Sequence, residues 1–353
     1  MDVLALDALA PTDVPIRIGN RKIFNENIHY QVMPSDHRTS IAKYSYATAG
    51  QIHEAIEVAL EARIPWERKP LKERADILLH AADLAAGKYR MRLNAATMLG
   101  QGKNIVQAEI DSACELIDFF RFNSKFALDL EKYEPISTKI STNKLVYRGL
   151  EGFVLAVAPF NFTAIGGNLA TSPALMGNVV LWKPSRTAVL SNYVIYELLE
   201  EAGVPPGVIA YLPSRGAEFG KVIFTSEHLS AVNFTGSVPT FKEIWRRVAE
   251  NLDKYVSFPR LVGEYAKSGE DGAEILLGGN CDDSKGYFID ATLIKTTDLK
   301  SKLISEEIFG PVLTVYVYDD SELETILSSI KSAMINYFGL NYALGVLLKL
   351  RIH

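Results

Sequence analysis

Four short, nearly continuous apolar runs in the middle of the chain narrow its possible folds more than anything else in the sequence. They are FVLAVAPF (153–160), NVVLWKPS (178–185), GVIAYLP (207–213) and SAVNFTG (230–236). Runs of this kind are typical of strands buried on both faces of a parallel sheet. Helix-length segments separate them, and one of these segments ends at Gly203 with Pro205 just beyond. Repeated strand–helix–strand units predict a right-handed, doubly wound α/β sheet.

Helical periodicity dominates the part of the chain that precedes these runs. From Ala49 to about Leu130, apolar residues recur at three- and four-residue spacing, which predicts a leading helical layer. The polar segment 136–152, with its β-branched residues, predicts a pair of strands or a hairpin. After Pro259 the regular alternation of strand-like and helix-like segments weakens, and two stretches of sequence that look unrelated meet near Glu264. We therefore expect one domain over 1–263 and a second, shortened α/β domain over 264–353.

Composition and charge limit the classes of function. With 48% hydrophobic and 22% charged residues among 353, the chain has the composition of a soluble globular protein. A net charge of -5 argues against a nucleic-acid or membrane partner and favours small-molecule chemistry. Two cysteines are too few for a disulfide framework, and six scattered histidines predict no metal site. The first fifteen residues show no targeting signal.

Candidate functional residues follow the predicted strands, at the edge of the sheet where ligands bind in open α/β folds. Asn161 follows the first strand, Lys183 ends the second, and Ser237 follows the fourth. Asn161 can donate to a developing oxyanion, and Lys183 can hydrogen-bond ribose hydroxyls. Ser237 begins a helix whose N-terminus can hold a pyrophosphate. Each also has an ordinary alternative, because asparagine forms turns, a lysine before proline is usually solvated, and serine caps helices.

Three residues nearer the carboxyl end leave the same choice open. Glu264 follows the strand-like RLVG and can act as a general base if it is desolvated, or can be a surface charge. Glu307 and Phe309 lie in SEEIFGPV, where Gly-Pro marks a turn and phenylalanine is usually a core residue. The glycine fingerprint G-x-G-x-x-G is absent from the sequence.

The joint order of these motifs is more specific than any one of them. PFNFT, WKPS, FTGS, GE and EEIFGPV succeed one another as in the aldehyde dehydrogenase superfamily, which the chain resembles from about Tyr30 to Glu264 and from about Ala273 to Tyr318. Longer strings such as FFRFN, YRGLEGF and GGNCDDSKGYF are similar to the subgroup that oxidises L-glutamate γ-semialdehyde to L-glutamate in proline degradation. The resemblance implies a Rossmann-like fold, NAD as cofactor, a small aldehyde substrate, a homodimer and the mitochondrial matrix.

The resemblance also implies roles for individual residues, position by position. Asn161 would be an oxyanion-hole donor and Glu264 the general base that hydrolyses the acyl-enzyme. Glu115 and Phe162 would line the aldehyde pocket. The segment 136–152 would correspond to the superfamily's oligomerisation strands.

The implied cofactor site is spread along the chain. Its residues would be Lys183 and Ser185 at the adenosine ribose, Gly236 and Ser237 at the pyrophosphate, and Glu307 and Phe309 at the nicotinamide end. Residues 1–263 would then form the NAD-binding domain, and 264–353 a remnant of the catalytic domain.

One part of this chemistry is missing from the sequence. The superfamily's mechanism needs a thiolate that attacks the aldehyde, after which hydride passes to NAD and the resulting thioester is hydrolysed. The nucleophile should lie downstream of Glu264, but there the sequence runs almost directly into AEILLGG, and the block that bears it is absent. Cys114 lies among helix-period residues, where we expect a buried structural thiol. Two aspartates follow Cys281 directly and disfavour its thiolate.

We therefore expect a shortened dehydrogenase that keeps its dinucleotide fold but is inactive, since loss of a nucleophile commonly costs ~10⁴-fold or more in rate. The superfamily's C-terminal stretch, which closes the aldehyde pocket, is also not recognised after about Ile330. One rival hypothesis is a non-catalytic protein that joins full-length subunits through 136–152 and modulates them. Another is a superfamily member that acts on a different aldehyde.

Overall fold

The chain divides into two compact units, which comprise Met1–Gly263 with Asp282–Phe288 and Glu264–Cys281 with Ile289–His353. The computed structural model describes residues 10–266, 274–298, 301, 303, 310–324 and 326. The predicted nicotinamide residues Glu307 and Phe309 lie outside these described residues.

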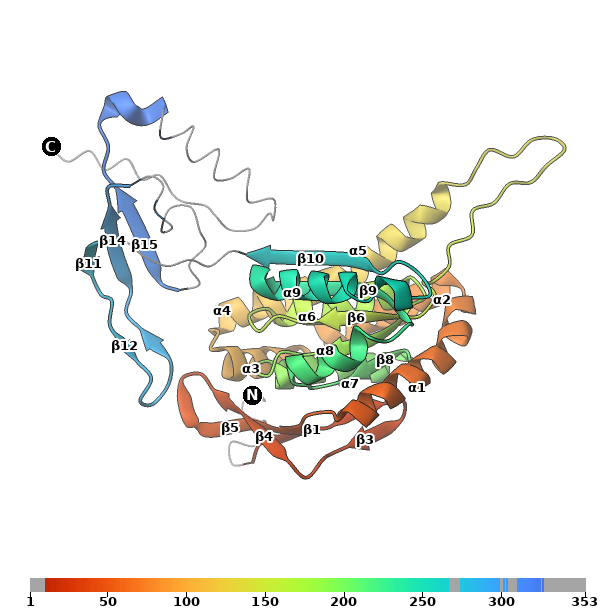
Figure 1. Cartoon of the computed structure of the whole chain (residues 1–353), viewed down its shortest axis with the longest axis horizontal. Helices are drawn as coiled ribbons and strands as arrows, with labels where there is room; N and C mark the ends of the chain where they lie inside the picture. The colour runs from red at the N-terminus through yellow and green to blue at the C-terminus, as the bar shows by residue number, and fades with distance from the viewer. Residues whose placement is uncertain are drawn as a thin grey trace. The chain divides into compact units, whose positions relative to one another are not determined.

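A seven-stranded sheet forms the centre of the first unit (Figure 1). The pairs β9–β6, β6–β7 and β7–β8 are parallel, which confirms the predicted doubly wound sheet. In spatial order the strands are β10 (Arg260–Ala266), β9 (Leu229–Ser237), β6 (Phe153–Val157), β7 (Val179–Lys183), β8 (Ile209–Tyr211), β2 (Ile16–Ile18) and β3 (Arg21–Ile23).

Helices cover both faces of this sheet, and the predicted helical layer over 49–130 is present. The α-helices are α1 (Ala49–Arg68), α2 (Leu71–Ala86), α3 (Arg90–Gln101), α4 (Ile105–Ala108), α5 (Leu116–Asp129), α6 (Thr163–Leu175), α7 (Val189–Ala202), α8 (Gly216–Ile223) and α9 (Val238–Ala249). The π-helix η1 (Glu109–Glu115) joins α4 to α5, and short 3₁₀ segments are η2 (Leu130–Lys132), η3 (Leu252–Lys254) and η4 (Asp320–Glu322).

Alternate residues of β6 face two separate hydrophobic cores. Phe153 and Leu155 pack in the core beneath α1, α8 and α9, whereas Val154 and Ala156 pack in the core beneath α2, α6 and α7. Because side chains of a strand alternate between its two faces, a strand covered on both sides must be apolar throughout. This is why β6 reads as a continuous apolar run.

The N-terminal segment adds strands that sequence reasoning did not assign. One small sheet, in the order β1-β5-β4, contains β1 (Thr12–Val14), β4 (Ile28–Met33) and β5 (Asp36–Ser45). The hairpin of β2 and β3 instead extends the central sheet, where β2 pairs antiparallel with β8 through Arg17 and Tyr211. The edge of the parallel sheet is thus closed by residues from the start of the chain.

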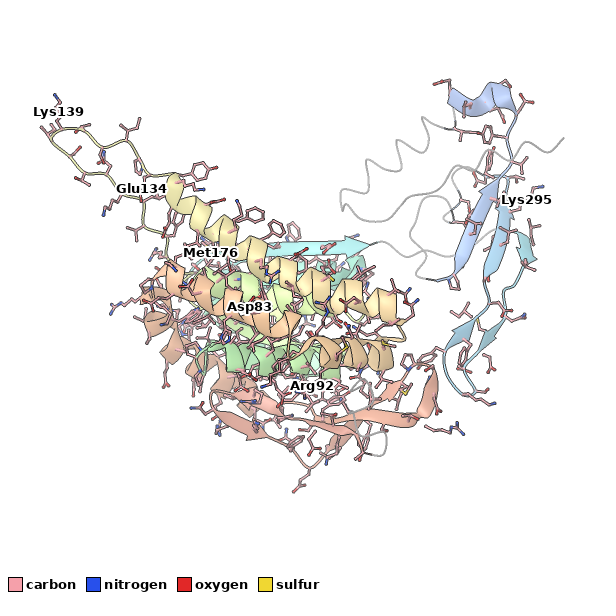
Figure 2. The ribbon with its side chains drawn as sticks, turned by 180° about the vertical axis from the view of Figure 1, so that it is seen from behind. Asp83, Arg92, Glu134, Lys139, Met176 and Lys295 are labelled. Atoms are coloured by element: carbon pink, nitrogen blue, oxygen red, sulfur yellow. The ribbon has the colours of Figure 1, made fainter. Side chains whose placement is uncertain are left out.

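An exposed arm, residues 133–148, follows η2 and projects from the end of α5 (Figure 1). Its backbone turns over at a single antiparallel bridge between Thr138 and Ser141. Of the two predicted alternatives, the pair of strands over 136–152 is therefore wrong, and the hairpin is reduced to this one bridge. Side-chain bonds hold the arm together instead: Asn143 donates to the Ile136 carbonyl at 2.7 Å, and Leu145 N donates to Glu134 at 3.0 Å. Figure 2 shows Lys139 at its tip.

The second unit is built mainly from strands. β14 (Thr292–Thr296) lies between β11 (Glu274–Leu277), its antiparallel neighbour, and β15 (Val312–Tyr316), its parallel neighbour. The short strands β12 (Cys281–Asp282) and β13 (Phe288–Ile289) pair with each other. Within the described part of the chain, no helix combines the length and apolar character needed to cross a bilayer.

Candidate active site

The register of the parallel strands brings most of the predicted site residues to one edge of the sheet. Val157, the last residue of β6, pairs with Lys183 of β7 and with Phe234 of β9. The turn that carries Asn161 therefore begins level with Lys183, and Gly236 and Ser237 follow two and three residues beyond Phe234. This is the carboxyl edge, where ligands bind in open α/β sheets.

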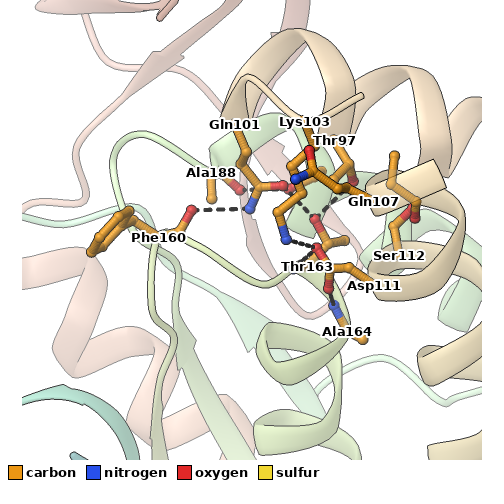
Figure 3. Close-up of polar contacts among 12 residues, drawn as sticks. Thr97, Gln101, Lys103, Gln107, Asp111, Ser112, Phe160, Thr163, Ala164 and Ala188 are labelled. Carbon is orange, nitrogen blue, oxygen red and sulfur yellow. Dashed lines mark hydrogen bonds and ion pairs between the residues drawn. The ribbon is translucent and has the colours of Figure 1, made fainter. Parts of the chain in front are cut away.

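The turn that contains Asn161 is held from outside by α3 (Figure 3). Gln101, the last residue of α3, donates to the Phe160 carbonyl at 3.0 Å and accepts from the Thr163 hydroxyl at 2.8 Å. Asn161 is half-buried, and its side-chain amide makes no hydrogen bond to any residue that the structure describes. An amide that is fixed in place but unpaired is suited to donate to a ligand oxygen.

The first turn of α6 is already occupied by a carboxylate of this chain (Figure 3). Asp111, which lies in η1 and is 1% exposed, accepts from the backbone N–H groups of Thr163 at 3.1 Å and Ala164 at 3.2 Å. Lys103 donates to the same carboxylate at 2.6 Å, and its ammonium lies 3.9 Å from the centroid of the Phe162 ring. Since a helix N-terminus favours one anion, Asp111 excludes a phosphate from this turn.

Lys183 stands at the end of β7 without a polar partner. Within the described residues its ammonium forms no hydrogen bond or ion pair, and burial lowers the pKa of the amine. Lys183 is half-buried, so its unpaired ammonium at the binding edge of the sheet is partly desolvated but can still be reached by a ligand. Hydroxyl groups of a ligand would accept its hydrogen bonds. Ser185, two residues on, is half-buried, and its hydroxyl lies 3.3 Å from that of Thr187.

The turn between β9 and α9 is a weaker anion site than its sequence indicates. Ser237 is the N-cap of α9, and its hydroxyl accepts from Thr240 N at 3.4 Å. Pro239 at the second helical position has no N–H, which leaves Val238 to donate in this turn. A Cβ at Gly236 would lie 2.7 Å from Cζ of Phe234, so glycine here also makes room for that ring.

The remaining predicted residues are placed with less detail. Glu264 is exposed in β10, which neighbours β9 in the sheet. Glu115 is half-buried at the end of η1, and Phe162 is half-buried at the start of α6. A π-helix within a run of α-helix is frequent at functional sites. Among the described residues, no group of three or more metal-ligating side chains is found.

The position of Cys114 corrects the expectation of a buried thiol, because its side chain is exposed. The thiol donates to the Glu109 carboxylate at 3.7 Å and accepts from Arg90 at 3.9 Å. Partial desolvation of the sulfur and the charge of Glu109 together raise the pKa of the thiol above its usual value. Cys281 is exposed in β12. At neutral pH, therefore, Cys114 is a thiol and a poor nucleophile.

Sequence reasoning missed Gln101, Lys103 and Asp111, which hold the Asn161 turn. A possible signal was Asp111 itself, because an aspartate within the largely apolar stretch AEIDSACELI needs a partner if it is buried. Lys103 is eight residues away, but the backbone partners Thr163 and Ala164 are about fifty residues away in sequence, and no local pattern points to them.

Comparison with protein families and curated proteins gives a consistent result. The aldehyde dehydrogenase family model matches residues 25–259 and 257–328. Delta-1-pyrroline-5-carboxylate dehydrogenase, mitochondrial, of Danio rerio is 41% identical over 406 positions, which cover 89% of this chain and 73% of that protein. The Homo sapiens protein of the same name is 42% identical over 409 positions, which cover 90% and 73%.

A solved structure agrees in fold. The Delta-pyrroline-5-carboxylate dehydrogenase from Mycobacterium tuberculosis bound with NAD has a TM-score of 0.88 and 34% sequence identity, covering 94% of this chain and 77% of that chain. Part of the difference in length is internal. Because 89% of 353 residues is about 314, roughly 92 of the 406 positions aligned with the Danio rerio protein have no counterpart here. The predicted shortening is confirmed.

Proposed function

The chain belongs to the aldehyde dehydrogenase family, and from that premise we propose that it is a shortened L-glutamate γ-semialdehyde dehydrogenase that binds NAD but does not oxidise the aldehyde. Full-length enzymes of this type convert the semialdehyde, formed from Δ1-pyrroline-5-carboxylate, to L-glutamate in proline degradation. The names of the relatives at 41% and 42% identity support this substrate class over another aldehyde. Those names also support a mitochondrial location.

The residues at the carboxyl edge of the sheet fit a dinucleotide. Lys183 offers a partly desolvated, unpaired ammonium to ribose hydroxyls, with the Ser185 hydroxyl two residues away. The α9 turn offers Val238 N–H to a pyrophosphate, and the α6 turn is closed to it by Asp111. When bound, NAD would accept a hydride at its nicotinamide. Asn161 would orient the aldehyde oxygen through its unpaired amide.

The observation that carries the proposed inactivity is the state of the two cysteines. Cys114 is protonated at neutral pH and held by Glu109 and Arg90. Cys281 lies in β12, after Gly278-Gly279-Asn280 and before two aspartates, and no motif relates it to the superfamily's nucleophile. Without a thiolate next to the aldehyde, neither the thiohemiacetal nor the hydride transfer that follows it can occur.

Two measurements on the purified chain test this function. Isothermal titration calorimetry should detect NAD binding, and an assay for NADH with L-glutamate γ-semialdehyde should detect no turnover above the buffer rate. Aldehyde-dependent NADH formation that disappears in a Cys114→Ser or Cys281→Ser variant would overturn the inactivity. Absence of NAD binding by a folded chain would overturn the cofactor assignment.

The exposed arm supports a second candidate function, association with a full-length subunit of this family. Its apolar side chains are unusually open to solvent: Ile136 is 88% exposed, Ile140 97% and Val146 82%. Several large apolar side chains exposed together on one segment are typical of a surface that contacts another protein. If the arm mediates association, the chain should co-purify with a full-length relative, and deletion of 136–146 should abolish this without lowering the melting temperature. Homodimer formation by this chain would be lost in the same deletion variant.

A further inference from the structure

Three cations without carboxylate partners gather at the carboxyl ends of the neighbouring strands β7 and β8. Lys183 ends β7, Arg186 follows it in the turn that Ser185 and Ala188 close at 3.1 Å, and Arg215 is the N-cap of α8, just beyond β8. In the part of the chain that the structure describes, none of the three forms an ion pair. The two guanidinium groups are exposed.

The strand register places both arginines beyond the same edge of the sheet: Trp182 of β7 pairs with Tyr211 of β8, and Arg186 and Arg215 each lie four residues beyond that pair. Burial raises the pKa of the Tyr44 phenol, and the charges of Arg186 and Arg215 both act in the opposite direction. Arg215 also lies over the Tyr46 ring, 5.4 Å from its centroid, and the Tyr44 and Tyr46 rings are 5.4 Å apart. Arg215 therefore contacts this pair of tyrosines, and Arg186 follows the end of the neighbouring strand.

The backbone next to Arg215 is uncrowded. A Cβ placed on Gly216, the first residue of α8, would meet no atom within 4 Å. Glu218, in the first turn of α8, is exposed and makes no ion pair with Arg215 among the described residues. Arg186 and Arg215 are thus exposed and Lys183 is half-buried, and no carboxylate of the described chain forms an ion pair with any of the three.

Dinucleotide folds distinguish NAD from NADP by the charge beside the adenosine ribose. A carboxylate there hydrogen-bonds the 2′-hydroxyl and repels a phosphate, whereas an arginine accommodates the 2′-phosphate of NADP. The planar guanidinium suits this role because it can donate two parallel hydrogen bonds to one phosphate. The proposed function requires Lys183 to bind the adenosine ribose. Arg186 lies three residues further along the same turn and would then stand beside the ribose 2′ position.

From this arrangement we propose that Arg186, aided by Arg215, binds a 2′-phosphate, so that the chain binds NADP⁺ at least as tightly as NAD⁺. This inference rests on the proposed dinucleotide site. It adds which of the two dinucleotides the site prefers, the one with a 2′-phosphate. Lys183 would hydrogen-bond the ribose of either cofactor, whereas Arg186 would bind only the 2′-phosphate of NADP⁺.

The test is calorimetric titration of the purified chain with NAD⁺ and NADP⁺ at one ionic strength. We expect Arg186→Ala to weaken NADP⁺ binding about tenfold, the effect of one lost charge-assisted contact, and to change NAD⁺ binding by less than about threefold. Arg215→Ala should act in the same direction. Lys139→Ala, which removes an equal charge from the tip of the arm, should leave both affinities unchanged (Figure 2).

Smaller probes separate the adenosine end from the rest of the cofactor. Adenosine 2′,5′-bisphosphate should bind more tightly than 5′-AMP, and rising KCl should weaken the first more than the second. The inference is overturned if NADP⁺ binds more weakly than NAD⁺, or if Arg186→Ala weakens both equally. If NAD⁺ binds and NADP⁺ does not, this inference alone fails. If the folded chain binds neither, the proposed cofactor site fails with it.

Discussion

Lys103 and Asp111 form an ion pair of 2.6 Å in which the aspartate is almost wholly buried and the lysine side chain is 17% exposed. The same aspartate caps α6, so one carboxylate joins η1, the loop after α3 and the turn that carries Asn161.

Removal of this carboxylate should be costly. Asp111→Ala leaves the Lys103 ammonium unpaired and two N–H groups of α6 uncapped, and we expect the free energy of unfolding to fall by about 3–5 kcal/mol. Urea denaturation followed by circular dichroism measures this. Asp76→Ala, which breaks the exposed pair with Lys72, is the matched control and should change stability by less than about 1 kcal/mol. Equal effects of the two substitutions would show that Asp111 is not the anchor.

Gly152 should not tolerate a side chain. Its φ of +133° is strained for other residues, and a Cβ there would lie 1.9 Å from the His228 carbonyl oxygen, which accepts the first hydrogen bond of β6. We expect Gly152→Ala to lower the free energy of unfolding by about 3 kcal/mol. Gly216→Ala, where a Cβ meets nothing within 4 Å, is the control and should be neutral or slightly stabilising. Thermal denaturation of the wild type and both variants measures the two effects.

Lys183 should make stability depend on pH. Burial lowers its pKa in the folded protein below the usual 10.5, so the folded state loses this proton first as the pH rises. The cost of burying the charged amine is therefore full at acid pH and disappears as the pH approaches 10.5. Lys183→Met should raise the free energy of unfolding by roughly 1–2 kcal/mol at pH 6.

The sign of this effect is checked by repeating the denaturation at pH 8 and pH 10, with wild type and Lys183→Met side by side. The difference between the two proteins should shrink as the pH rises. A difference that is constant over this range would mean that the lysine is not desolvated. In parallel, NAD affinity should fall in the variant, because the ribose loses a donor.

Alkylation of Cys114 should be slow at neutral pH and accelerate above pH 9, since the raised pKa keeps the thiol protonated. Glu109→Gln removes a charge that opposes the thiolate, and labelling by iodoacetamide at pH 8 should be several-fold faster. Asp118→Asn removes a charge with a smaller influence on the same thiol and should have less effect. Mass spectrometry of the labelled peptide distinguishes Cys114 from Cys281. Equal rates for all three proteins would contradict this electrostatic account.

Regular, local patterns made the central part of the fold predictable. β6 and β7 read as continuous apolar runs because both faces of the sheet are covered, and Gly203 marks the end of α7 through its left-handed conformation. The N-terminal strands were missed, since three-residue strands such as β2 carry too few residues for a period. Their partners lie far away in sequence, and only tertiary pairing reveals them.

The site was predictable to a lesser degree. Strand ends located Asn161, Lys183 and Ser237, because parallel strands must finish at one edge. The contacts of Asp111 and the unpaired state of Lys183 depend on residues that only folding brings near. The arm misled because β-branched residues alone do not make a ladder: its Thr138 and Ser141 bond across the turn, and Asn143 bonds the backbone in place of a strand.

The pairing of Arg17 with Tyr211 has a consequence for biosynthesis. A nascent polypeptide cannot complete the outer border of its main sheet until nearly two hundred residues after β2 have left the ribosome. Until then the β2–β3 hairpin lacks its neighbour in that sheet, whereas β1, β4 and β5 can already pair with one another.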